Sequence, residues 1–90
     1  MDEGKLNEMA ARGSRAQTLL ENDLLKDAFK YLSDEYVATW KLTTPKDAQA
    51  REQLWIAVNI IGKVQDHLTK FVVDGKIASR DLANIKYLKP

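Results

Sequence analysis

Seven apolar residues between positions 50 and 71 recur at alternating spacings of four and three. They are Ala50, Leu54, Ala57, Ile61, Val64, Leu68 and Phe71. This spacing places all seven on one face of an α-helix, in the pattern of a coiled-coil-like seam. Trp55 and Ile60 fall outside the seam, which indicates a second buried surface. Such a helix needs more cover than one 20-residue partner helix supplies, so we expect self-association.

A second amphipathic helix precedes the seam helix. Asn22 or Asp23 caps it, and its apolar face continues to position 40, which predicts a helix over residues 23–42. The face consists of Leu25, Phe29, Leu32, Tyr36 and Trp40. The short connection that follows implies that the two helices fold back antiparallel as a hairpin.

The boundaries of the seam helix follow from its breakers. Thr44 as N-cap, Pro45 at the first helical position and Asp47 three residues after the cap predict a start at position 45. Asp74 and Gly75 predict its end, with Gly75 suited to the left-handed position after a helix. The predicted helix therefore covers residues 45–73.

The two ends of the chain show weaker patterns. Residues 1–16 carry a faint helical stripe broken by Gly13 and Ser14, which predicts a weaker helix. Residues 76–90 have four basic residues and one acid, and their apolar positions predict a short helical tail. We expect a single all-α domain over residues 1–90, with residues 1–16 and 76–90 flexible or ordered by a partner.

Composition excludes several classes of protein. The chain has 90 residues, of which 44% are hydrophobic and 30% charged, too apolar for a disordered protein. It has no cysteine, which removes disulfides and thiolate chemistry. No apolar run is long enough to cross a membrane, and the first residues lack the apolar region of a secretion signal. We therefore expect no membrane contact and no secretion by a signal of its own.

Candidates for catalysis are few. His67 is the only histidine, and no acid lies near it at a metal-ligand or general-base spacing. The acid pairs Asp34–Glu35 and Asp23–Asp27 are typical of a solvated helix surface. We expect no enzyme activity, no metal or other cofactor, and no small-molecule substrate.

Four residues are candidates for a protein interface: Trp40, Trp55, Ile60 and Tyr36. The two tryptophans flank the turn and could lie close together at the closed end of the hairpin. Tryptophan is enriched at the energetic centres of interfaces, but it also caps the cores of small domains. The sequence leaves both interpretations open.

The basic tail suggests an alternative function. Lys76, Arg80, Lys86 and Lys89 could contact nucleic-acid phosphates if several copies presented their tails together. Against this, the whole chain carries only +1, so residues 1–74 carry −2 and would repel the same phosphates. Loss of DNA binding with rising salt would distinguish this function from a protein-binding one.

The stretch from about residue 20 to 78 resembles small uncharacterised proteins of tailed bacteriophages. The similarity lies in paired leucines before an Ala-Phe pair, an acid–aromatic block ending in tryptophan, a proline turn and a late Asp-Gly-Lys segment. These are Leu24-Leu25, Ala28-Phe29, Glu35 to Trp40, Pro45, Arg51-Glu52, Leu54-Trp55, His67-Leu68 and Asp74 to Ala78. The resemblance implies a phage origin, no catalytic residues, and a place in the phage particle or the cytoplasm of a bacterial host.

These observations favour a non-enzymatic helical protein that self-associates into a bundle or ring and binds a protein partner. Its expected setting is phage particle assembly or DNA packaging. The alternatives are a nucleic-acid-binding accessory protein and a small regulator that binds a host enzyme.

Overall fold

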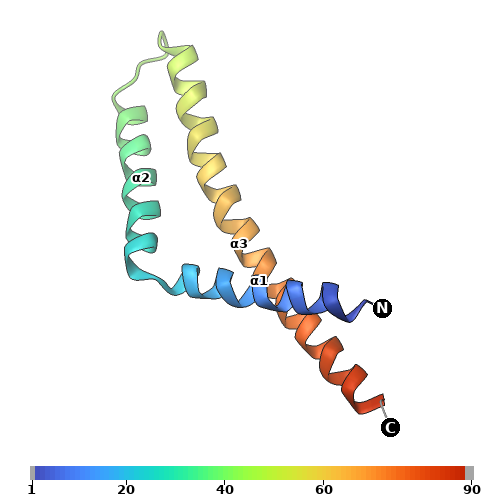
Figure 1. The fold of residues 1–90 in the computed structure, drawn as a ribbon. Helices are drawn as coiled ribbons and strands as arrows, with labels where there is room; N and C mark the ends of the chain where they lie inside the picture. Colours follow the sequence, from blue (N-terminus) through green and yellow to red (C-terminus); the bar gives the residue numbers. More distant parts are fainter. Residues whose placement is uncertain (1, 89–90) are drawn as a thin grey trace. The chain divides into compact units, whose positions relative to one another are not determined.

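The computed structural model describes residues 2–88 and contains, within that range, three α-helices and no strand. They are α1 (Glu3–Glu21), α2 (Asp23–Lys41) and α3 (Ala48–Leu88) (Figure 1). The prediction of an all-α fold is confirmed. The chain divides into two compact units. Unit 1 contains α1 and the part of α3 from Asp66 onward, and unit 2 is the segment Asn22–Gln65.

Unit 2 is an antiparallel hairpin of α2 and the first half of α3 (Figure 1). The Asn22 side chain caps α2, since its Oδ1 accepts the Leu25 backbone N–H at 2.9 Å. The helix ends at Lys41, one residue before the predicted end. No residue of α2 is buried, and Ile61 is the one buried apolar residue that the structure describes in unit 2.

The connection from α2 to α3 forms its own turn, so α3 starts later than predicted. The Asp47 N–H donates to the Thr44 carbonyl at 2.8 Å, and the Asp47 carboxylate accepts the Thr44 N–H at 2.8 Å. The first bond closes a turn over residues 44–47, and the Asp47 carbonyl then accepts the Arg51 N–H at 2.9 Å. The first helical residue is therefore Ala48, not Pro45.

The prediction that Asp74 and Gly75 end this helix is wrong. α3 continues through both residues to Leu88, and no described glycine has a positive φ. The short separate tail predicted for residues 76–90 is instead, up to Leu88, the last part of a 41-residue helix. The seam spacing continues across the glycine through Gly75, Ala78, Leu82 and Ile85. The apolar face is thus unbroken where the local sequence suggests a stop.

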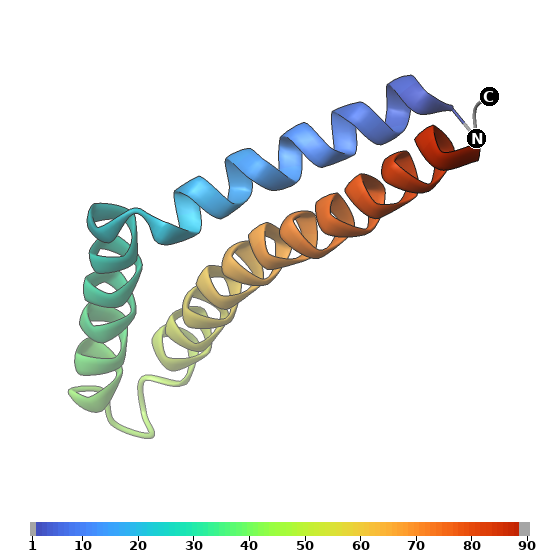
Figure 2. The ribbon, with the colours of Figure 1, turned by 90° about the horizontal axis from the view of Figure 1, so that it is seen from below.

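Gly75 lies inside the helix because unit 1 needs a residue without a side chain there. A β-carbon on Gly75 would lie 2.8 Å from the Gly13 Cα and 3.1 Å from the Met9 carbonyl oxygen. On Gly13 it would lie 2.7 Å from the Phe71 carbonyl oxygen. The two backbones therefore approach more closely than any larger residue permits. Figure 1 shows α1 crossing the second half of α3 within this unit, and Figure 2 shows the two segments side by side.

α1 is longer than the weak helix predicted over residues 1–16. Five of its residues follow the same alternation of three and four: Leu6, Met9, Gly13, Ala16 and Leu20. Of these, Leu6, Gly13 and Ala16 are buried. Arg12 places its guanidinium carbon 4.3 Å from the centre of the Phe71 ring, a cation–π contact between α1 and α3. That the two ends of the chain are flexible or ordered by a partner stays a prediction.

Candidate interaction surface

An apolar hollow lies at the closed end of the hairpin in unit 2. Val37 and Trp40 of α2 line it together with Leu54, Trp55 and Val58 of α3. Its cavity volume is about 120 Å³, and all five side chains that form it are apolar or aromatic. Trp55 remains 64% exposed beside it. The structure thus brings the two predicted tryptophans to one hollow that the hairpin does not fill.

Arg51 fixes the Trp40 side of this hollow. Its guanidinium carbon lies 4.1 Å from the centre of the Trp40 ring. The same guanidinium donates from Nη1 to the Thr43 hydroxyl at 2.8 Å and to the Thr43 carbonyl at 3.3 Å. A planar guanidinium can stack on an aromatic ring and donate hydrogen bonds at its edge at the same time. Arg51 therefore links the end of α2, the connecting turn and the start of α3.

The other two predicted interface residues lie elsewhere on the hairpin. Tyr36 is half-buried on α2, and Ile60 is exposed on α3. Ile56 and Val64 are also exposed, one helical turn before and after Ile60. Ile56, Ile60 and Val64 therefore form a row on one face of α3, which we call the α3 row.

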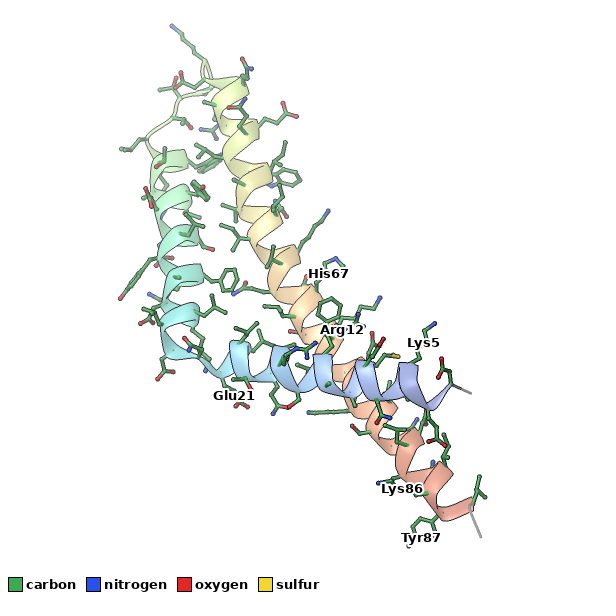
Figure 3. All side chains as sticks on the ribbon, in the orientation of Figure 1. Lys5, Arg12, Glu21, His67, Lys86 and Tyr87 are labelled. Atoms are coloured by element: carbon green, nitrogen blue, oxygen red, sulfur yellow. The ribbon has the colours of Figure 1, made fainter. Side chains whose placement is uncertain are left out.

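The predicted nucleic-acid contacts are spread around α3 in unit 1. Lys76 and Arg80 stand one turn apart and share a face, and Arg80 pairs with Asp81 at 3.8 Å. Lys86, near the last turn of the helix (Figure 3), lies about a third of a turn around the axis from Arg80. Lys89 lies outside the described residues. The described basic residues therefore do not form one stripe.

The side chains considered for catalysis, His67 and the two acid pairs, are exposed. His67 lies on the surface of α3 with its ring centre 6.4 Å from that of Phe71, close to Arg12 (Figure 3). Asp34 pairs with Lys30 along α2 at 3.4 Å. Within residues 2–88, no three histidine or acidic side chains gather as a metal site would require. In the same range, no helix combines the length and the hydrophobicity needed to span a bilayer.

Some residues of this surface were missed from the sequence. Ile56 is not among the predicted interface residues, and Val64, which belongs to the predicted seam, is 45% exposed. Both stand four positions from Ile60, so the spacing that marks one helix face would have identified the α3 row. Arg51 has no such signal, because its contact with Trp40 depends on how the turn brings the two helices together.

We find no family model, no curated protein and no solved structure that matches the chain.

Proposed function

We propose that this chain is a non-enzymatic interaction protein that associates with copies of itself through unit 2. The observation that supports the proposal is the apolar surface left open on the hairpin: the exposed α3 row, and Trp55 beside a hollow with no polar lining side chain. Large exposed apolar patches on small domains mark protein interfaces. Two hairpins that cover each other's open faces form a four-helix bundle, a stable arrangement for amphipathic helices.

The setting that we propose is phage particle assembly or DNA packaging. This part of the proposal rests on the sequence pattern between residues 20 and 78, from the leucine pair before Phe29 to the Asp74-Gly75-Lys76 segment. A structural component of this kind needs a protein-binding surface and no catalytic group. A small regulator that binds a host enzyme would use the same surface.

The nucleic-acid alternative has less support. Non-specific DNA binding relies on several cations that reach phosphates together. Lys76 and Arg80 share one face of α3, but Arg80 has an acidic neighbour and Lys86 lies on another side. We therefore do not place the function in the basic end of α3.

Light scattering tests the proposed function. At about 100 µM the chain should have the mass of a dimer or a larger assembly, because association depends on concentration. Ile60→Gln should shift the equilibrium toward the monomer without loss of helicity. Leu88→Gln, which changes an aliphatic residue 83% exposed at the other end of α3, serves as the matched control and should leave the mass unchanged. A monomer with full helicity at this concentration would overturn the proposal and favour the regulator.

A further inference from the structure

The α3 row is an apolar face that the hairpin does not cover. Ile56, Ile60 and Val64 are 43, 54 and 45% exposed, while the adjacent Ile61 is buried. Ile61 points about 100° away from Ile60 around the helix. The face that packs inside unit 2 is therefore the one that contains Ile61, not the one that contains Ile60. The α3 row therefore lies beside that face and is open to a partner.

Two opposite charges lie along one edge of the α3 row. Glu52 stands one turn before Ile56, and Lys63 stands one turn after Ile60 at nearly the same angle around the helix. Both side chains are exposed, and neither forms an ion pair within residues 2–88. The opposite edge of the row contains the small residue Ala57. One edge therefore has an acid at one end and a base at the other.

We propose that a second copy of this chain packs antiparallel on the α3 row, with Glu52 of each copy facing Lys63 of the other. In this register Ile56 of one copy lies beside Ile60 of the other, and the two-fold axis passes between positions 57 and 58. The proposal rests on the proposed function and specifies the partner and its orientation.

The charge pattern favours the antiparallel orientation over the parallel one. In an antiparallel pair of identical helices, the same edge of each row meets, running in opposite directions. Each Glu52 then meets a Lys63, and the pair forms twice. A parallel pair would place the two copies of Glu52 at the same height, about 16 Å along the axis from either Lys63. The edge residues would then gain no opposite charge.

A second copy also fits this edge better than an unrelated partner of one charge. A two-fold interface uses the same patch on both sides, so each patch must complement itself. An edge with one acid before Ile56 and one base after Ile60 meets that condition. A uniformly acidic or basic partner would bring a like charge against either Glu52 or Lys63.

Charge reversal tests the register. Glu52→Lys or Lys63→Glu alone replaces two attractions with two repulsions and should weaken dimerisation about tenfold by analytical ultracentrifugation. An equimolar mixture of the two variants restores opposite charges in a heterodimer, and its affinity should return to within about threefold of the original. Asp27→Lys makes the same charge change on the exposed surface of α2, outside the row, and should have no such effect.

Cross-linking tests the orientation directly, because the chain has no cysteine of its own. Glu52→Cys mixed with Lys63→Cys should give mostly mixed products with a short bis-maleimide, and each variant alone should give few. Cross-linked products of Glu52→Cys with itself would overturn the antiparallel register. Charge reversals that leave the dimer's affinity unchanged would do the same, and in both cases the self-associating function stands. A monomer at all concentrations would overturn both.

Discussion

Unit 1 places glycine and alanine where its two helices meet, whereas unit 2 places leucine, isoleucine and tryptophan along the same helix α3. Among the described residues, unit 1 contains three of the four buried apolar side chains, Leu6, Ala16 and Ala78. Unit 2 contains only Ile61. Side chains at a helix contact determine how closely the two axes approach.

The difference indicates a division of roles. The absence of a side chain at Gly13 and Gly75 lets the backbones of α1 and α3 come into contact in unit 1. The larger side chains of unit 2 remain partly exposed, as at Trp40 and Trp55. Unit 1 therefore buries the contact between its two helices, although Leu19, Val73 and Ile77 remain exposed outside that contact. Unit 2 leaves most of its large apolar side chains exposed or half-buried.

The largest expected effect comes from a charge in the small core of unit 2. Ile61→Asp places a carboxylate at its buried apolar position and should destabilise the fold by roughly 3–5 kcal/mol. Far-ultraviolet circular dichroism should show loss of most helicity at 25 °C. Ile60→Asp is the matched control, because Ile60 is exposed; it should keep the helicity and weaken self-association. An Ile61→Asp protein that melts like the original would show that unit 2 has no core at this position.

The next effect concerns the glycine contact of unit 1. Gly75→Ala adds a methyl group that would meet the Gly13 backbone at 2.8 Å, so the helices must separate. The strain should exceed the gain in helix propensity and destabilise the fold by about 1–2 kcal/mol. Urea unfolding measures this as a lower midpoint. A midpoint equal to or above that of the original would mean that α1 and α3 do not touch at Gly75.

The error at Gly75 shows what a sequence pattern can and cannot predict here. A cap at Asn22 or Asp23, the helix that follows it and the antiparallel return after Pro45 depend on neighbouring residues, and their patterns predicted them, although α3 starts at Ala48 and not at Pro45. Gly75 after Asp74 has the local signature of a helix end, but its role depends on Gly13, far away in the chain. Only the seam spacing that continues beyond it distinguishes the two roles.

The residues of the candidate surface also fall into those that the sequence could predict and those that it could not. Trp40, Trp55 and Ile60 could be selected because large apolar residues near a turn or off a seam are local features. The stack of Arg51 on Trp40 could not, because it requires the path of the turn that closes through Thr44 and Asp47. Residues that act across a turn are identified only when the turn itself is known.

The smallest effect has the opposite sign and comes from the other glycine of α3. A β-carbon on Gly62 would meet nothing within 4 Å, so Gly62→Ala gains helix propensity without strain. It should stabilise the fold by about 0.5–1 kcal/mol, seen as a higher urea midpoint. Because Gly62 and Gly75 lie in one helix, the opposite signs isolate the effect of the glycine contact. Destabilisation by Gly62→Ala would instead indicate an additional contact in unit 2.

The arrangement of unit 1 has a consequence for the order of folding. This unit combines the first helix of the chain with the end of the last one, and the whole of unit 2 lies between them in the sequence. Contacts within the hairpin form between residues close in sequence, whereas residue 13 must find residue 75. Closing a long loop costs entropy that increases with its length, so local contacts form first. The hairpin should therefore fold before α1 docks, and its apolar surface is then exposed to other copies while the chain is still completing its fold.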